Sequence, residues 1–235
     1  MNNKIKSFLK SFTLFEIFLI TIGITLVTTF SIVFGANPLA ICSSVIGIIG
    51  VVFIAKGSVI GSVLGIIMSI FYIIVSYING LYGEVVLYVL VIIPMNILSI
   101  IQWFKNVSQD KVTIKVQKTA KKDLIILAIA TIIAIPIVYI ILKFFNTQSL
   151  ILSTFSIIIS TVGTYLNVKR DKLTFIVFIL HNLVVISLWI VTIINIQNLS
   201  LIPIIVNSSV NLFSNMYGVI NWTKMQKKQN QKGSY

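Results

Sequence analysis

The chain consists of long apolar segments separated by short polar ones. A helix that crosses the hydrocarbon core of a bilayer needs about 20 residues, most of them apolar. Eight segments meet or approach this length, and we predict a transmembrane helix over each of them: 12–34, 38–55, 58–78, 84–104, 124–144, 150–168, 173–194 and 199–222. Strands of a membrane barrel would alternate polar and apolar residues, and these segments do not. The pattern therefore predicts an all-α integral membrane protein.

The composition supports a lipid environment. Hydrophobic residues make up 57% of the 235 residues and charged residues only 10%, whereas about a quarter of a soluble domain is charged. The net charge of +13 would suit a nucleic-acid partner. Because the basic residues flank apolar spans, we expect membrane lipid and no nucleic acid as the partner.

The placement of the basic residues predicts the orientation. Cytoplasmic loops of membrane proteins are enriched in Lys and Arg. With eight spans and a cytoplasmic N-terminus, 17 of the 18 basic residues fall in cytoplasmic segments, and only Lys143 falls on the other side. We therefore predict a multi-pass protein of the cytoplasmic membrane with both termini in the cytoplasm. The first span is too long for the apolar region of a signal peptide, so we expect it to be retained.

The order of spans predicts an internal repeat. Two triplets of helices, 38–104 and 150–222, each end in an amide, a Trp and a Lys two residues later: Gln102-Trp103 with Lys105, and Asn221-Trp222 with Lys224. One connecting helix, 124–144, gives both triplets the same orientation, which makes a parallel 3+1+3 repeat. Transporters built from such repeats bind substrate near the midplane.

Three further segments lie outside this core. Residues 1–35 form a basic N-terminus and an extra helix, 105–123 form a basic cytoplasmic loop, and 223–235 form a basic cytoplasmic tail. We expect the loop to be a mobile, solvated linker, with recognition of anionic lipid as the alternative.

Polar and aromatic side chains form stripes on several spans, and these predict the site. A polar group at membrane depth is costly unless it faces protein or water. Amides can hydrogen-bond a polar solute and aromatic rings can stack on a planar one. The predicted substrate-binding residues are Tyr72, Tyr88, Asn96, Phe175, Phe178, Asn182, Trp189, Asn207 and Asn211. We expect them to converge on one wet cavity halfway through the bilayer.

Other roles remain open for some polar residues. The stripe from Ser153 to Asn167 favours contact between helices, since small and amide residues also pack helices in lipid. His181, the only histidine, suits either packing or a proton relay. Glu16 and Glu84 lie near helix ends, where we expect hydration to make them inexpensive.

The sequence offers no enzyme chemistry. Its five acidic residues are scattered, and no nucleophile–base pair or glycine-rich phosphate loop is present. One cysteine and one histidine do not make a metal site. We therefore predict neither catalytic residues nor a metal or other cofactor.

Several motifs resemble the PnuC family of nicotinamide riboside transporters over roughly residues 38–224. The matching stretches are Ala55-Lys56-Gly57, Val75-Ser76-Tyr77, Asn79-Gly80-Leu81-Tyr82-Gly83-Glu84, Pro94-Met95-Asn96, Gln102-Trp103, Val168-Lys169-Arg170, Leu188-Trp189 and Tyr217-Gly218-Val219-Ile220-Asn221-Trp222. The resemblance implies a core like that of the sugar-transporting SWEET proteins and a homotrimer. It also implies uptake of a vitamin precursor or nucleoside by facilitated diffusion, with a cytoplasmic kinase trapping the substrate.

The chain departs from this family at three places. The family commonly has Trp-x-x-Trp-x-x-x-Asn on the seventh helix, where this chain has Phe175, Phe178 and Asn182. A phenyl ring still stacks but lacks the indole N–H donor. Asn96 stands where the family often has Gln, and the eighth helix carries Asn in place of Tyr. These changes leave a different nucleoside or vitamin open as the substrate.

Three functions follow from these observations. The first is a facilitator for nicotinamide riboside or a related nucleoside. The second is a proton-coupled carrier of another small polar solute that uses His181. The third is a membrane assembly subunit that transports nothing, which the buried amides disfavour.

Overall fold

The computed structural model describes residues 12–108, 113–147 and 149–232. Lys4, Lys6, Lys10 and Lys111 lie outside these ranges. The helices are α2 (Leu14–Val33), α3 (Pro38–Lys56), α4 (Ile60–Ile78), α5 (Tyr82–Leu87), the π-helix η1 (Tyr88–Ile92), α6 (Ile93–Lys105), α7 (Lys121–Phe144), α8 (Leu150–Val168), α9 (Leu173–Ile196), the 3₁₀-helix η2 (Leu199–Leu201) and α10 (Ile202–Lys232).

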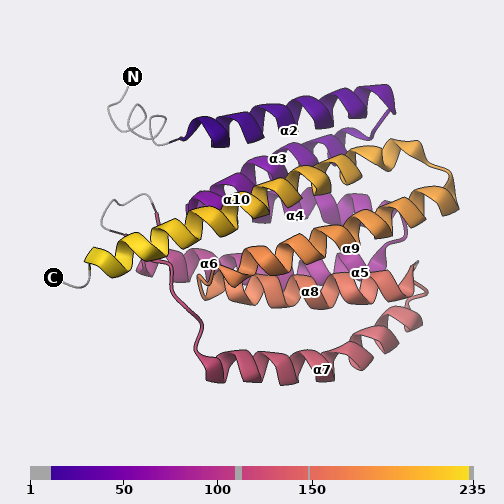
Figure 1. Cartoon of the computed structure of the whole chain (residues 1–235). Coiled ribbons are helices and arrows are strands. Elements are labelled where there is room, and N and C mark those ends of the chain that lie inside the picture. Colours follow the sequence, from indigo (N-terminus) through magenta and orange to yellow (C-terminus); the bar gives the residue numbers. More distant parts are fainter. Residues whose placement is uncertain (1–11, 109–112, 148, 233–235) are drawn as a thin grey trace.

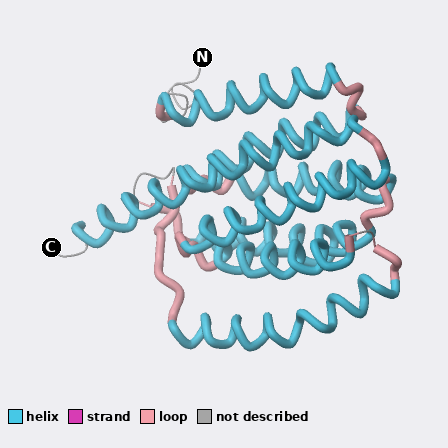
Figure 2. The backbone as a smooth tube through the Cα atoms, turned by 45° about the vertical axis from the view of Figure 1, so that its right-hand side comes forward, coloured by secondary structure: helices cyan, strands magenta, loops and turns pink. Residues whose placement is uncertain are grey.

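The predicted all-helical architecture is confirmed. The described chain has eight helical stretches that are long and apolar enough to cross a membrane, and α5, η1 and α6 together form one of them. The helices lie side by side along one axis, with α2 on one flank of the bundle and α7 on the opposite flank (Figure 1). Short turns join most of them, and a longer segment leads from α6 to α7 (Figure 2).

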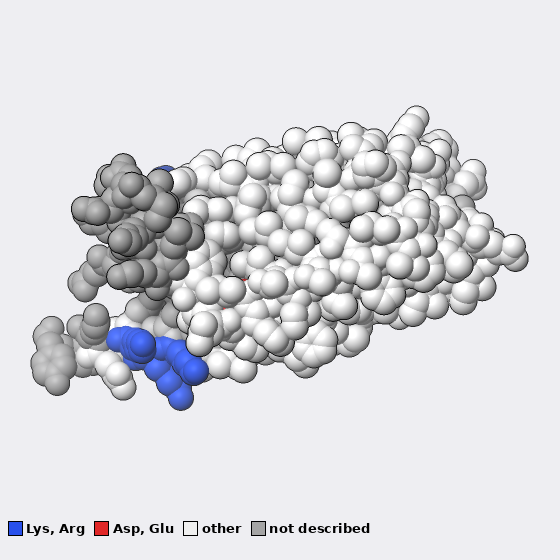
Figure 3. Space-filling model, turned by 90° about the horizontal axis from the view of Figure 1, so that it is seen from above, with Lys and Arg blue, Asp and Glu red and all other residues white. Residues whose placement is uncertain are grey.

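The two ends of the bundle differ in charge. One end, called the basic end below, is where α3 and α6 end and α7 begins, at Lys56, Lys105 and Lys121. Figure 3, which views the molecule from the side of α2, shows Lys and Arg gathered at one end of an otherwise almost uncharged face. The other end is called the opposite end.

The connecting helix α7 has the most exposed apolar surface. Among its described side chains only Leu142 is buried, and α7 packs mainly against α8. Isoleucines such as Ile132 and Ile140 point outward with about two thirds of their surface exposed, at 68% and 65%. A helix that is apolar on all sides is stable where its surroundings are lipid or another apolar surface.

Equivalent hydrogen bonds link the two triplets of helices. The indole Nε1 of Trp103 donates to the carbonyl of Asn167 at 3.0 Å, and that of Trp222 donates to the carbonyl of Ile54 at 3.2 Å. Each acceptor lies three residues before a residue with left-handed backbone, Arg170 (φ 60°) and Gly57 (φ 80°). The paired bonds support a pseudo-twofold relation between the triplets.

The loop from 105 to 123 differs from the expected mobile linker. Its described part crosses the basic end in contact with the helix turns there. The backbone N–H of Ile114 donates to the Gly57 carbonyl at 3.0 Å, and that of Gln117 donates to the Arg170 carbonyl at 3.1 Å. Ile114 is 1% exposed. Because Gly57 and Arg170 belong to different triplets, this segment, residues 113–119, is a strap that joins them.

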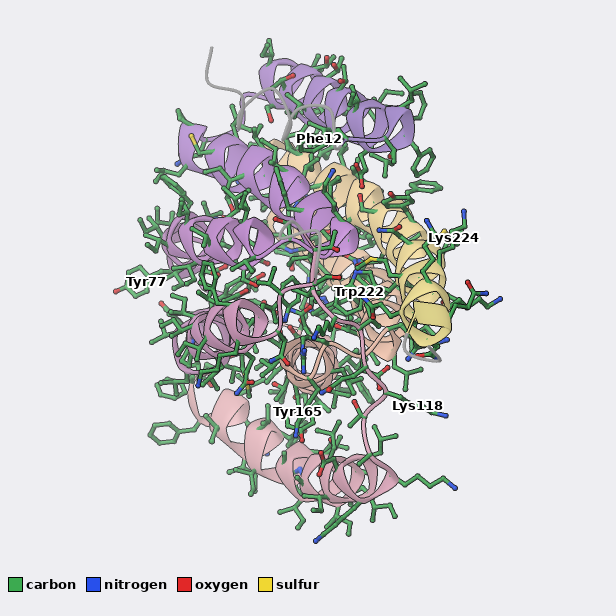
Figure 4. All side chains as sticks on the ribbon, turned by 90° about the vertical axis from the view of Figure 1, so that its left-hand side faces the viewer. Phe12, Tyr77, Lys118, Tyr165, Trp222 and Lys224 are labelled. Carbon is green, nitrogen blue, oxygen red and sulfur yellow. The ribbon has the colours of Figure 1, made fainter. Side chains whose placement is uncertain are left out.

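The last helix extends beyond its predicted end at Trp222. α10 continues to Lys232, so ten residues of the expected tail are helical. Gln229 accounts for part of this extension, because its side chain accepts from the Val116 N–H at 3.0 Å and donates to the Ile114 carbonyl at 3.1 Å. Figure 4 shows this end of the bundle, with Trp222 directed to its centre and Lys224 directed outward.

The two glutamates near helix ends are not hydrated. Glu16 and Glu84 are each 2% exposed. Lys56 pairs with Glu16 at 3.1 Å, and the Tyr217 hydroxyl donates to the same carboxylate at 2.9 Å. These contacts fasten the extra helix α2 to the core, so hydration at the membrane surface is not what makes Glu16 tolerable.

Candidate substrate-binding site

Three of the predicted site residues form an aromatic cluster. The rings of Tyr72 on α4 and Tyr88 on η1 lie 4.4 Å apart between centroids, and Trp189 on α9 meets Tyr72 edge-on at 6.4 Å. Each lies six or seven residues from the opposite end of its helix, a depth of roughly 10 Å. The cluster therefore combines both triplets at one level of the bundle.

This cluster has an unused donor. Trp189 is fully buried, and its indole N–H has no hydrogen-bond partner at good geometry among the described residues, although it interacts weakly with the Tyr72 side chain. Buried N–H groups are nearly always paired, because leaving one without a partner costs about 1–3 kcal/mol. A polar ligand beside the cluster would satisfy it.

A small cavity adjoins the cluster. It is lined by Ala40, Ser43, Ser44, Tyr72, Val75, Ile204 and Asn207. Its volume is about 10 Å³, which is the space of a single water molecule. None of the lining residues is Lys or Arg.

The amides at mid-membrane depth are engaged with their own helices. Asn96 donates to the Ile92 carbonyl at 2.9 Å, and Asn182 donates to the Phe178 carbonyl at 2.7 Å. Asn96 also faces Gly65, where an added Cβ would lie 3.0 Å from its Oδ1. Both side chains are buried between helices.

The asparagines of α10 keep unused acceptors. Asn211 donates to the Asn207 Oδ1 at 3.5 Å, whereas its own Oδ1 and that of Asn215 have no hydrogen-bond partner among the described residues. These two amide oxygens are therefore buried without a partner in the described chain, a state that is costly unless another group reaches them.

The backbone around Asn96 is irregular. Pro94 has no N–H, and the residues just before it, Tyr88–Ile92, form a π-helical turn. Such turns are rare and are frequent at functional sites. The turn places Tyr88 in the aromatic cluster, so the irregular backbone and the cluster belong to one region.

The two phenylalanines lie apart from that cluster. Phe175 is fully buried at the basic end, where it packs edge-on against Trp222 at 4.8 Å, within a group that includes Trp103 and Ile114 of the strap. It is fourteen residues from Trp189 on the same helix, roughly 21 Å away. Phe178 packs on Gly163, with its ring 6.3 Å from that of His181.

The predicted site residues therefore do not all lie around one cavity in the described structure. The predicted residues occupy three levels: the aromatic cluster, the mid-depth amides, and Phe175 at the basic end. A site for a drug-sized solute needs several hundred Å³. Such a solute can enter only if the helices separate.

Sequence reasoning did not include Glu84 or Ser156 among the site residues. The Ser156 hydroxyl donates to Glu84 Oε1 at 3.1 Å and lies 3.3 Å from His181 Nε2. Glu84 is one helical turn from Tyr88, which places both on one face. The signal in the sequence is an acidic residue four positions before a stripe tyrosine.

Comparisons with known proteins give the family. The family model described as "Nicotinamide mononucleotide transporter" matches residues 37–224. A "Nicotinamide riboside transporter PnuC" from Neisseria mucosa is 28% identical over 205 residues, which cover 84% of this chain and 78% of that protein.

A solved structure has the same fold. The "Crystal structure of the Vitamin B3 transporter PnuC" superposes with a TM-score of 0.82 at 26% identity, and the match covers 92% of this chain and 94% of that one. The family match spans both triplets and the strap between them, and the shared fold includes most of the chain. The protein therefore belongs to the nicotinamide mononucleotide transporter family, as a multi-pass membrane transporter of the PnuC type.

Proposed function

We propose that this protein moves nicotinamide riboside or a closely related nucleoside across the cytoplasmic membrane by facilitated diffusion. The observation that carries the proposal is the aromatic cluster of Tyr72, Tyr88 and Trp189, next to a cavity that Tyr72 lines together with the amide of Asn207. Aromatic rings suit the flat base of the solute, and amide groups suit the ribose hydroxyls and the carboxamide.

The charge of the site favours a nucleoside over a nucleotide. A phosphate group needs Arg, Lys or a helix N-terminus close to it. The residues that line the cavity include no basic side chain, and buried Lys56 is already paired with Glu16. Nicotinamide mononucleotide would bring two negative charges into this region without a partner, so the riboside fits better.

Transport requires the two triplets to move relative to each other. The closed cavity lies near the opposite end, and the Trp–carbonyl bonds and the strap close the basic end. Rocking of one repeat against the other would open each end in turn. The basic end would face the cytoplasm, following the positive-inside rule. There a kinase would trap the substrate by phosphorylation, so no coupling ion is required.

The exposed apolar surface of α7 agrees with assembly into a homotrimer within lipid, which we include in the proposal. Neither assembly nor trapping is needed for the transport step of one protomer.

Uptake into proteoliposomes tests the function. Labelled nicotinamide riboside should equilibrate across the membrane without ATP and without an ion gradient. Nicotinamide mononucleotide should not enter, and liposomes without protein give the background. Accumulation above equilibrium, or entry of the mononucleotide alone, would contradict the proposal.

The Ser156 contact with His181 favours a second candidate, proton-coupled transport. An imposed pH gradient should then drive accumulation, and His181→Gln should abolish that drive while leaving equilibration intact. Uptake that is indifferent to the gradient would exclude this mechanism.

A further inference from the structure

A buried carboxylate without a cation lies beside the aromatic cluster. Glu84 is 2% exposed, and its one hydrogen bond among the described residues comes from the neutral Ser156 hydroxyl. The ion pairs of the described chain are Lys56–Glu16 and Lys169–Asp123, and neither includes Glu84. An ionised carboxylate in such surroundings is costly unless a positive charge compensates it.

The other buried glutamate provides a direct comparison. Glu16 is buried to the same extent, but it accepts from Lys56, from the Tyr217 hydroxyl and from the Thr13 N–H. Its role is structural, because Lys56 and Tyr217 fasten α2 to the core and the Thr13 contact caps the start of α2. Glu84 lacks this set of partners, and its one hydrogen bond within the described chain is to Ser156 of α8.

Glu84 also lies within electrostatic reach of both tyrosines of the cluster. It precedes Tyr88 by one turn, and Tyr88 contacts Tyr72. Aromatic faces attract cations through their ring electrons, and the attraction increases where water is excluded. A carboxylate one helical turn from a cluster of three aromatic rings is therefore suited to a flat ring that carries a positive charge.

We propose that Glu84 is the counter-charge for a cationic heteroaromatic ring, and that it makes the site selective for pyridinium nucleosides over neutral ones. This inference rests on the proposed function, because nicotinamide riboside carries a permanent positive charge on its ring nitrogen, where the sugar is attached. The ring would lie against Tyr72, Tyr88 and Trp189, with Glu84 compensating its charge. Ser156 holds the carboxylate in position.

The same arrangement explains selectivity without a basic residue. Uridine, adenosine and other neutral nucleosides could stack on the rings, but they would leave the carboxylate without a positive partner. A buried charge left unpaired costs more than a neutral hydrogen bond gains. The preference for a cation therefore follows from the buried carboxylate itself.

Equilibrium binding to the purified protein tests this charge selectivity. The two ligands are nicotinamide riboside and benzamide riboside, a neutral isostere in which carbon replaces the pyridinium nitrogen. The unaltered protein should bind the cationic ligand about tenfold or more tightly than the neutral one. Glu84→Gln should remove this preference while changing the affinity for benzamide riboside little.

Matched variants separate charge from shape. Glu84→Asp keeps the charge and should keep most of the preference. Ser156→Ala removes the hydrogen bond but not the charge, and should weaken the preference only in part. The proposal would be overturned if Glu84→Gln lowered the affinity for both ligands equally, or lowered neither. A residue with only a structural role does not distinguish the charge of the ligand.

A further ligand keeps this proposal distinct from the proposed function. N1-methylnicotinamide has the cationic ring without the sugar. If it binds in a manner that depends on Glu84 while neither riboside binds, the counter-charge is upheld and the nucleoside function is contradicted. If both ribosides bind equally well to the unaltered protein, the function stands and the counter-charge role falls.

Discussion

At the scale of single residues, the two ion pairs of the described chain differ in burial and should differ in their effect on stability. Lys56→Met would leave Glu16 buried without its cation, which typically costs about 3–5 kcal/mol of the free energy of unfolding. Asp123→Asn should cost less than about 1 kcal/mol, because its pair with Lys169 is about one third exposed. Thermal unfolding of the two variants in one detergent compares them, and a larger loss in Asp123→Asn would contradict the assignment.

The Lys169 contribution should also have a defined pH dependence. The hydrogen bond to Asp123 raises the pKa of Lys169 from its usual 10.5. A raised lysine pKa gives stability that is present below the unfolded value and is lost as pH rises through the folded value. The difference in melting temperature between Asp123→Asn and the unaltered protein should therefore be constant from about pH 6 to 9. It should shrink only at more alkaline pH.

Glycines at helix contacts make a second residue-scale prediction. A Cβ at Gly61 would lie 2.6 Å from the Ile54 nitrogen and 2.8 Å from the Gly50 oxygen, both backbone atoms. At Gly47 it would meet the flexible Met68 side chain at 3.4 Å. Gly61→Ala should therefore lower the free energy of unfolding by roughly 1–3 kcal/mol or more, because α3 and α4 must separate. Its melting temperature should fall accordingly. Gly47→Ala should be nearly neutral.

At the scale of elements, the spans were predictable because lipid leaves few alternatives. A segment in hydrocarbon must satisfy its own backbone, so length and hydropathy alone predict α8 at residues 150–168. Contacts between distant segments were less accessible. Nothing in the sequence near Ile114 indicates that its N–H donates a hydrogen bond to the Gly57 carbonyl. Nor does it indicate that the Gln229 side chain donates to the Ile114 carbonyl.

The candidate site was predictable in part, because helical periodicity shows which residues share a face of one helix. On α4 the predicted site residue Tyr72 is buried, on a face that it shares with Ser69 and Ser76. Helical periodicity does not give depth relative to other helices, so it could not separate Phe175 from Trp189. Nor could proximity to a helix end reveal that Glu84 is buried, because burial there depends on how α8 packs against α5.

The strap gives the element-scale prediction. Ile114 is 1% exposed among Trp103, Phe175 and Trp222. Replacing it with Ala should cost about 2–5 kcal/mol of stability, as for other buried large-to-small changes. The exposed neighbour Lys115→Ala is the matched control and should be nearly neutral. A strap that behaves as the solvated linker expected from its charge would give the same melting temperature for both variants.

At the scale of the whole molecule, the closed cavity and the bridged basic end imply that substrate must change the exposure of the strap. Cys42 is the only cysteine, so a Cys42→Ser background allows single labelling sites to be introduced. In that background, Ile114→Cys places a thiol within the buried cluster, and Lys118→Cys places one on the exposed part of the strap. The figure labels Lys118 on the segment that crosses the basic end (Figure 4).

In the Lys118→Cys variant, a thiol-reactive maleimide should react at the same rate with and without nicotinamide riboside. Labelling at 114 should be slow without substrate and several times faster with it, because transport requires the Trp–carbonyl bonds and the strap to separate at least transiently. The Glu84→Gln substitution should remove the acceleration for the cationic nucleoside, since that solute would no longer be held well enough to shift the population. If the rate at 114 instead stays slow while transport proceeds, the solute leaves by a path that does not pass the strap, and the basic end is not the exit that the fold suggests.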